Sequence, residues 1–302
     1  MKERGAQARA WLFVLPALVL LSAYLVYPTI QTFRTSLFGG TGFNPNRFVG
    51  LRNYLLLLTH DSLFLSLSRW PPSGALVNNI LWLILFSGGT LVFGLLIAVL
   101  ASGTRLERIV KSAVFLPMVI SATAAAVIAR FLFSPDASIG LLNALFVALI
   151  PGLTPVSWLG TSEVVNYALI ATGIWIWTGL SMTVLSAAYK SIDPQILEAA
   201  RVDGASPWKT FWRISLPMLS QPLSFVAITM IINSLKMIDL VLVMTAGGPA
   251  GTSRVIGFSF YWEVFNNNLV GYGSAVAILM LIPLAPLMAV QVRRIRRQES
   301  GK

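Results

Sequence analysis

Acidic and very small residues come together in one segment of this otherwise apolar chain, from Asp193 to Leu216 (DPQILEAARVDGASPWKTFWRISL). Glu198 and Asp203 place two carboxylates there, and carboxylates form strong hydrogen bonds with cationic side chains. Ala199 and Ala200 leave room for another backbone to come close. These residue types favour binding of another protein by this segment. An ordinary amphipathic loop between two helices is the alternative interpretation.

A second set of polar residues, Thr229, Asn233 and Lys236, has the spacing i, i+4 and i+7, which places the three on one helical face. Asp239 follows, and we expect it one helical turn beyond Lys236. Ionisable residues in apolar segments are costly, and they usually line a pathway or pair with one another. We therefore expect this face to line the path of a polar solute. A Lys236–Asp239 pair that only packs the protein is the alternative.

Trp177 and Ser181 lie in another long apolar segment and add an aromatic ring and a hydroxyl group. An aromatic face can pack against the C–H surface of a solute such as a sugar ring, and a hydroxyl can form hydrogen bonds with its OH groups. We expect both residues to contribute to the solute path. Trp177 could equally be a membrane-interface or packing residue.

Groups for covalent or metal chemistry are scarce. His60 is the only histidine, and its position beside Asp61 in a polar segment favours a solvated surface role. The chain has no cysteine, so thiolate metal sites and disulfides are excluded. It also lacks the Gly-x-x-x-x-Gly-Lys-Ser/Thr loop that binds nucleotide phosphates. We expect no enzymatic activity, no metal site and no cofactor in this chain.

Local signals predict a helix–turn–helix for the segment 190–216. Asp193 can accept hydrogen bonds from a first helical turn, and Pro194 suits the first helical position because its missing N–H needs no partner there. Gly204 is placed where a left-handed residue would end this helix. Ser206 and Pro207 repeat the start signal for a second short helix.

The composition indicates the class of protein to which the segment 190–216 belongs. The chain of 302 residues is 56% hydrophobic and 11% charged, and its mean hydropathy is +0.76, which indicates a membrane protein. Uncharged windows of about 20 residues suffice for spanning helices. We expect an all-α polytopic protein with one transmembrane domain over residues 1–302. Its six predicted spans are about 11–30, 77–101, 113–133, 165–188, 217–242 and 270–292.

Two apolar segments need separate treatment. Residues 137–162 are uncharged, but the continuous apolar run is short and Pro151 and Pro155 interrupt it, so we expect an interfacial or re-entrant segment. The basic start followed by Trp11–Ile30 resembles a signal peptide in outline. Its apolar run is too long and lacks a small-x-small cleavage site, so we expect a retained span.

Positive charge predicts the orientation. With six spans and the amino terminus inside, fifteen Lys and Arg residues fall in cytoplasmic segments and five in outer segments. Both termini and loop 190–216 are therefore expected in the cytoplasm. The net charge of +11 is distributed around membrane spans and not along one stripe, so we expect no nucleic-acid binding. The cluster Arg293–Arg297 is expected to contact anionic membrane lipid.

The segment 190–216 resembles the EAA loop of permease subunits in ATP-binding-cassette importers. The matching residues are Glu198-Ala199-Ala200, Asp203-Gly204-Ala205, Phe211, Ile214, Leu216 and Pro217. In that family an ATPase subunit grips this cytoplasmic loop. The resemblance implies that seven residues couple this chain to an ATPase: Glu198, Ala199, Ala200, Asp203, Gly204, Leu216 and Pro217.

Three further motifs extend the resemblance to roughly residues 10–293. Phe48–Tyr54 (FVGLRNY) and Met244–Pro249 (MTAGGP) look like outer-loop signatures of sugar-importer permeases, and Leu141–Ala144 also fits that group. The group is the carbohydrate-uptake, maltose-permease-like branch of type I importers. The chain departs from the larger maltose-permease subunit because it lacks a large outer domain.

The resemblance implies a function and a set of partners. The chain would be one transmembrane subunit beside a second homologous permease and two ATPase subunits, which would bind ATP and Mg²⁺. An external solute-binding protein would deliver a carbohydrate, at the inner membrane of a prokaryotic cell. Alternatives within transport are a permease for glycerol-3-phosphate, whose phosphate Lys236 would attract, or one for another small solute. A membrane-embedded enzyme would need a convergent acid or metal site, and a secondary carrier would have no use for an EAA loop.

Overall fold

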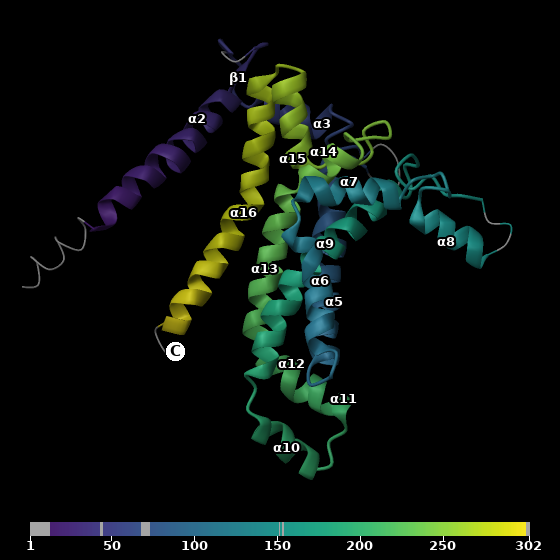
Figure 1. The fold of residues 1–302 in the computed structure, drawn as a ribbon. Coiled ribbons are helices and arrows are strands. Elements are labelled where there is room, and N and C mark those ends of the chain that lie inside the picture. Colours follow the sequence, from purple (N-terminus) through teal and green to yellow (C-terminus); the bar gives the residue numbers. More distant parts are fainter. Residues whose placement is uncertain (1–12, 43–44, 68–72, 151, 153, 300–302) are drawn as a thin grey trace, which may run out of the picture. The chain divides into compact units, whose positions relative to one another are not determined.

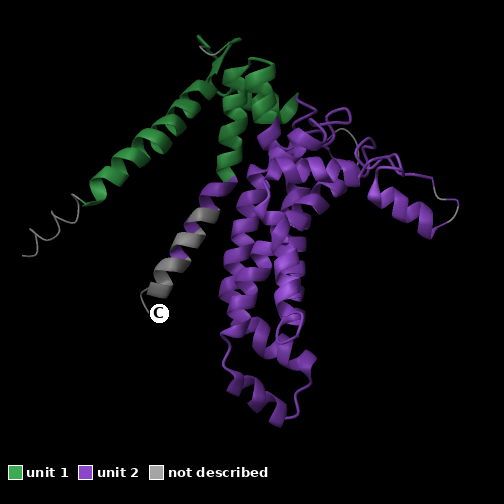
Figure 2. Cartoon of the chain, in the orientation of Figure 1, with its two compact units in different colours: residues 1–60, 259–282 green, residues 61–258, 283–302 purple. Residues whose placement is uncertain are grey.

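The computed structural model describes residues 13–42, 45–67, 73–150, 152 and 154–299 (Figure 1). The chain divides into two compact units (Figure 2). Unit 1 consists of residues 1–60 and 259–282, and unit 2 consists of residues 61–258 and 283–302. The fold is predominantly helical, as the sequence predicts.

The elements follow one another with short connections. The N-terminal helix Phe13–Ser36 includes the π-helical turn η1 (Ser22–Val26) and α2 (Tyr27–Ser36). Next come β1 (Phe38–Gly39), β2 (Arg47–Phe48), α3 (Arg52–Thr59), α4 (Ala75–Leu81), η2 (Trp82–Phe86), α5 (Ser87–Ala101), α6 (Glu107–Val119), α7 (Ala122–Leu132) and α8 (Leu141–Leu149). The remaining elements are α9 (Val165–Lys190), α10 (Pro194–Val202), α11 (Pro207–Thr210), η3 (Phe211–Ser215), α12 (Leu216–Met218), α13 (Ser220–Lys236), α14 (Asp239–Met244), α15 (Ile256–Tyr261), η4 (Trp262–Asn266) and α16 (Val270–Glu299).

In unit 1, the motif FVGLRNY fixes the end of the N-terminal helix. The last carbonyl groups of a helix have no partner within it. Asn53 donates from Nδ2 to the carbonyl oxygens of Ser36 (2.8 Å) and Phe38 (2.9 Å), and the Tyr54 hydroxyl bonds to Ser36 Oγ at 2.6 Å. Beside them, β1 pairs antiparallel with β2, with Phe38 opposite Phe48. The motif therefore has a structural role at the end of this helix.

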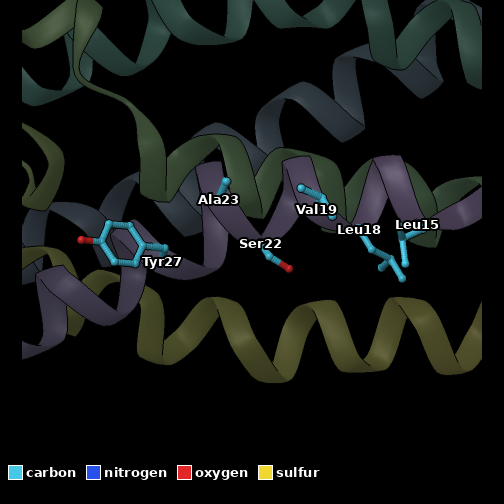
Figure 3. Close-up of a pocket in the computed structure, with 6 residues that line it drawn as sticks. All are labelled: Leu15, Leu18, Val19, Ser22, Ala23 and Tyr27. Carbon is cyan, nitrogen blue, oxygen red and sulfur yellow. The ribbon is translucent and has the colours of Figure 1, made fainter.

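The N-terminal helix itself is apolar and has no buried residue over its most hydrophobic stretch. Leu15, Leu18, Val19, Ser22, Ala23 and Tyr27 line a shallow groove along one side of it (Figure 3). An apolar helix of 24 residues is long enough to cross the hydrocarbon core of a bilayer. This helix corresponds to the first predicted span, of which residues 11 and 12 lie outside the described residues.

The core of unit 2 is a parallel contact between η2–α5 and α9. Gly173 of α9 lies against the rings of Trp82 and Phe86, and Gly94 of α5 lies against Ser181, further along both helices. Residue numbers thus increase in the same direction along the two helices. A Cβ built on Gly94 would lie 2.2 Å from Ser181 Oγ, so the helices approach as closely as a glycine allows.

Helix α6 runs antiparallel to α9. Gly179 of α9 contacts Val114 and Phe115, whereas Lys190 at the end of α9 pairs with Glu107 at the start of α6. Loop 102–106 and the coupling loop 190–216 therefore lie at the same end of unit 2 (Figure 1). From this end α6 runs toward the end of unit 2 at which α9 starts, but its contact with Gly179 reaches only the middle of α9.

The segment after α7 has features of a loop that does not cross the membrane. Helix α8 has only nine residues, too few to span a bilayer. The buried side chain of Asn143 donates to the carbonyl oxygens of Ser134 (2.8 Å) and Val156 (2.9 Å) and accepts from the backbone N–H of Val156 and from Trp158 Nε1. Asn143 thereby holds both ends of this segment together, as a non-spanning loop requires.

The predicted span 113–133 is not one continuous helix. The chain bends by 105° between α6 and α7. Ile120 adopts an extended conformation, and the Ser121 hydroxyl accepts a bond from the backbone N–H of Ala124, which starts a new helix. Pro117 lies in the last turn of α6, where its ring disfavours a longer helix.

The predicted span 217–242 is interrupted twice. A 69° bend at Leu219 separates α11–α12 from α13, and α13 ends at Lys236 because Met237 is extended. Among the described residues, three helices are long and apolar enough to cross a membrane, and the two bent pairs raise this number to five. The sixth predicted span corresponds to the shorter apolar stretch Val270–Pro286 of α16.

Candidate coupling loop and solute path

The coupling loop, residues 190–216, has the helix–turn–helix structure that its sequence predicts. The Asp193 carboxylate accepts a bond of 2.9 Å from the backbone N–H of Gln195, and Pro194 occupies the first position of α10. The Ser206 hydroxyl accepts from the backbone N–H of Lys209, again with a proline next in sequence. Both short helices therefore start from side-chain caps that satisfy free N–H groups.

Helix α10 ends in a Schellman motif. Gly204 adopts φ +74°, its N–H donates to the carbonyl of Arg201, and the N–H of Ala205 donates to the carbonyl of Ala200 at 2.9 Å. The left-handed conformation is the reason for a glycine at this position. Two capped ends and a closed turn make the loop a compact unit.

The predicted coupling residues lie on the outside of this unit, with one exception. Ala200 is buried, Leu216 is partly buried, and the other members are exposed: Glu198, Ala199, Asp203, Gly204 and Pro217. Trp208 and Trp212 are exposed as well and contact one another edge to face. Carboxylates beside large exposed aromatic rings form a surface suited to a protein partner.

An ion-pair cluster fixes the base of this loop. Glu107 Oε1 lies 2.5 Å from both Lys111 Nζ and Lys190 Nζ, and Glu107 Oε2 accepts from the backbone N–H of Gly103. Glu107 lies before the predicted span 113–133. The hydrogen bond from Lys111, followed in size by the one from Lys190, lowers the pKa of Glu107 to about 2. Sequence analysis missed this role of Glu107, although an acid four residues before a lysine in a basic segment signals such a pair.

Helix α13 carries the predicted polar face. Thr229 and Asn233 are partly buried, and Lys236 is exposed at the last position of the helix. Thr229 Oγ1 donates to the carbonyl of Phe225 at 2.8 Å. Within the part of the chain that the structure describes, the Asn233 amide makes no hydrogen bond. Its donor and acceptor atoms are therefore unpaired within this part of the chain.

The position of Asp239 differs from the prediction. Lys236 ends α13, whereas Asp239 begins α14, so the two residues do not follow one another on a continuous helix. They also form no ion pair within the described chain. Asn79 stabilises the break, because its Nδ2 donates to the carbonyl of Ser234 and its Oδ1 accepts from the backbone N–H of Ile256 at 2.6 Å. One buried side chain thus satisfies a freed acceptor of α13 and a free donor of α15.

The two predicted residues on α9 have different surroundings. Trp177 is partly buried, on a helix that packs against α13. Ser181 is 0% exposed, faces Gly94, and its hydroxyl has no hydrogen-bond partner among the described residues. The geometry makes Ser181 a packing residue of the α5–α9 contact, closed to solute in this arrangement.

The loop 245–255, which includes most of the motif MTAGGP, forms a tight turn. The backbone N–H of Gly248 donates to the carbonyl of Thr245, and Ser253 Oγ donates to the carbonyl of Gly248 at 2.6 Å. Buried Asn78 donates to the carbonyls of Thr252 and Arg254, both at 2.7 Å. The loop is therefore fixed to α4.

Comparison with known proteins decides which family has this architecture. Residues 90–299, more than half of the chain, match the family described as binding-protein-dependent transport system inner membrane component. The chain belongs to this family. It is thus the membrane component of an importer and not the ATPase, in agreement with the EAA resemblance.

Relatives of this permease cover nearly its full length. It is 44% identical over 292 residues to the osmoprotective compounds uptake permease protein GgtC of Synechocystis sp., covering 95% of this chain and 99% of the relative. It is 37% identical to the alpha-glucoside transport system permease protein AglF of Rhizobium meliloti, covering 97% and 84%.

A solved structure shows the same fold. A chain of the bacterial alginate ABC transporter, crystallised in complex with an alginate pentasaccharide-bound periplasmic protein, superimposes with a TM-score of 0.78 at 21% identity and covers 97% of each chain. The permease therefore has the type I ABC importer permease fold that the motifs imply.

Proposed function

We propose that this permease is one of two transmembrane subunits of an ABC importer for a carbohydrate or a related polyol. Relatives named for alpha-glucosides and for osmoprotective compounds support this substrate class. The partners would be a second homologous permease, two ATPase subunits that bind ATP and Mg²⁺, and an external solute-binding protein. The observation that carries the proposal is the structure of the coupling loop. Its two helices start from side-chain caps, its first helix ends in a hydrogen-bonded turn, and its exposed side chains can contact a partner protein.

The orientation follows from charge. Loop 102–106 and the coupling loop lie at one end of unit 2, where basic residues such as Arg105, Arg108 and Lys190 gather. The positive-inside rule assigns this end to the cytoplasm. Both termini would then be cytoplasmic, in the inner membrane of a prokaryotic cell, and loop 245–255 would face the binding protein.

The mechanism needs no covalent chemistry in this chain. Closure of the ATPase subunits on ATP would move the coupling loop as a rigid body, because its two helices are capped and joined by a hydrogen-bonded turn. The ion pair between Lys190 and Glu107 ties the base of the loop to α6. Movement of the loop would thus reach α9 and α6 together and would shift the permease between inward-open and outward-open states.

The solute path would run along α13. The free amide of Asn233 can both donate to and accept from sugar hydroxyls, and Thr229 adds a hydroxyl on the same face. Trp177 on the neighbouring helix would supply an apolar ring face. Ser181 is left out of this path because it is enclosed between α5 and α9.

Lys236 supports a second candidate substrate. Its exposed ammonium group has no carboxylate partner within the described residues, and it ends the polar face of α13. A free cation at this position would favour an anionic solute such as glycerol-3-phosphate. The substitution Lys236→Met separates the two candidates, since uptake of a neutral sugar should survive it and uptake of a phosphate ester should not.

The coupling role is tested with Glu198→Lys in the complete transporter. We expect the variant to insert and assemble normally but to lose most solute-stimulated ATP hydrolysis and transport, because a cation replaces the carboxylate offered to the ATPase. Glu163→Lys is the matched control, since it makes the same charge change in an exposed residue before the other end of α9. Normal uptake by Glu198→Lys would refute the assignment.

A further inference from the structure

A strongly basic cavity lies between loop 102–106, α6 and the last residue of α9. It has a volume of about 610 Å³, and its lining includes Arg105, Arg108, Lys111 and Lys190 together with one acid, Glu107. Four cations and one carboxylate leave the cavity with a clear excess of positive charge. Such an excess attracts anions.

The single carboxylate is already fully used. Glu107 Oε1 contacts both lysines, and Glu107 Oε2 accepts from the backbone N–H of Gly103. Arg105 and Arg108 are exposed and have no carboxylate partner within the described part of the chain. Their guanidinium groups, which bind phosphate in a bidentate manner, are therefore free for a ligand.

An apolar groove adjoins the basic cavity. Its volume is about 660 Å³, and its lining includes Ile97, Leu100, Leu106 and Val110. Thr104 and Arg105 line both spaces, so the groove and the cavity share a wall. Leu100 is 72% exposed, which is unfavourable in water and suitable against an acyl chain.

We propose that the groove and the cavity together form a binding site for an anionic phospholipid. The phosphate would lie between Arg105 and Arg108, and an acyl chain would follow Ile97 and Leu100 along α5. Free phosphate would balance the charge but leave the groove exposed, whereas a neutral lipid would fill the groove and leave the arginines unpaired. The site lies where α5 ends and α6 begins, which is the depth of a phospholipid headgroup.

The position of this site gives the lipid a regulatory role. Lys190 lines the cavity and is also the last residue of α9, immediately before the coupling loop. An anion beside Glu107 would compete for the two lysines that hold the base of that loop. Occupancy by anionic lipid should therefore change the rate of solute-stimulated ATP hydrolysis.

The experiment compares retention of phosphatidylglycerol by the complete transporter, measured by native mass spectrometry while lipid is titrated. The double substitution Arg105→Gln, Arg108→Gln should weaken retention roughly 25-fold, because each of the two cations near the headgroups contributes about fivefold. The control Arg47→Gln, Arg52→Gln removes the same charge from exposed residues of unit 1 and should leave retention unchanged. Arg105→Lys, Arg108→Lys keeps the charge and should retain most of the binding.

A second arm distinguishes lipid from free phosphate. Leu100→Ser should weaken retention of phosphatidylglycerol, whereas it should not change competition by inorganic phosphate, which has no acyl chain. If Leu100→Ser leaves lipid retention unchanged while phosphate displaces the lipid, the site takes a soluble anion and the proposal is wrong. Wild-type retention by the double glutamine variant would overturn the proposal as well.

Discussion

Gly94 of α5 and Ser181 of α9 are in direct contact: a Cβ on Gly94 would lie 2.2 Å from Ser181 Oγ and 2.9 Å from the backbone nitrogen of Met182. Glycine is the only residue that permits this separation of the helices. The contact lies in the core of unit 2, so the distance between α5 and α9 depends on it.

We expect Gly94→Ala to destabilise the permease by about 1–3 kcal/mol, because the added methyl group forces the helices apart or distorts their side chains. Thermal unfolding of the detergent-solubilised transporter measures this loss. Gly88→Ala is the control on the same helix, since a Cβ there meets nothing within 4 Å and should be neutral or slightly stabilising. Equal melting temperatures for the two variants would contradict the contact.

Gly204→Ala should weaken coupling without disturbing the membrane helices. A Cβ at Gly204 meets no neighbour, so the cost of about 1–2 kcal/mol comes only from the left-handed backbone at φ +74°. We expect reduced protection of α10 in hydrogen exchange and lower solute-stimulated ATP hydrolysis.

Gly42→Ala provides the matched control for this prediction. Gly42 has φ +88°, and a Cβ there also meets nothing within 4 Å, but it lies in unit 1, between β1 and β2. The backbone cost is the same, and α10 should stay protected. If both variants lose coupling equally, the effect is not specific to the end of α10.

Asn79→Ala should lower the stability of the permease, whereas Asn233→Ala should weaken transport. Asn79→Ala leaves the carbonyl of Ser234 and the N–H of Ile256 without their partner, which should cost about 1–3 kcal/mol for each buried group. Asn233→Ala removes an amide that bonds to no described residue, so stability should change little while transport weakens. Paired measurements of melting temperature and solute affinity test both statements. A solute affinity of Asn233→Ala equal to that of wild type would remove Asn233 from the path.

The Glu107 cluster predicts a pH dependence at the base of the coupling loop. The pKa of Glu107 falls from 4.5 to about 2 on folding, so its contribution to stability is complete above about pH 4.5 and is lost as pH decreases toward 2. The difference in melting temperature between wild type and Glu107→Gln should be present at neutral pH and vanish near pH 2. Glu163→Gln, an exposed acid without an ion pair in the described chain, should match wild type at every pH.

Signals between near neighbours in sequence were sufficient to predict the coupling loop. Asp193 with Pro194, Gly204, and Ser206 with Pro207 each act within five residues, and the structure has the cap, the turn and the second cap at these positions. The apolar windows likewise located the long helices, because burial in a bilayer depends mainly on composition.

Contacts between distant residues account for the differences. No proline or glycine marks the break after Lys236, and Asn79, far away in sequence, supplies the bond that stabilises it. Ser181 is likewise buried because Gly94 of α5 lets the two helices come close. The sequence pattern of α9 alone does not reveal this contact. Ser121, a residue type that often caps the start of a helix, was a local signal for the bend. The long uncharged window around it nevertheless predicted one continuous span.

The parallel pairing of α5 with α9 has a consequence for biosynthesis. Helix α5 leaves the ribosome well before α9, because α6, α7 and α8 come between them in the chain. Until α9 inserts, the glycine face of α5 can contact only lipid, and an apolar helix tolerates that environment without folding further. Assembly of the core must therefore wait for late synthesis, and truncation before Val165 would leave α5 inserted yet unpaired, a substrate for membrane quality control.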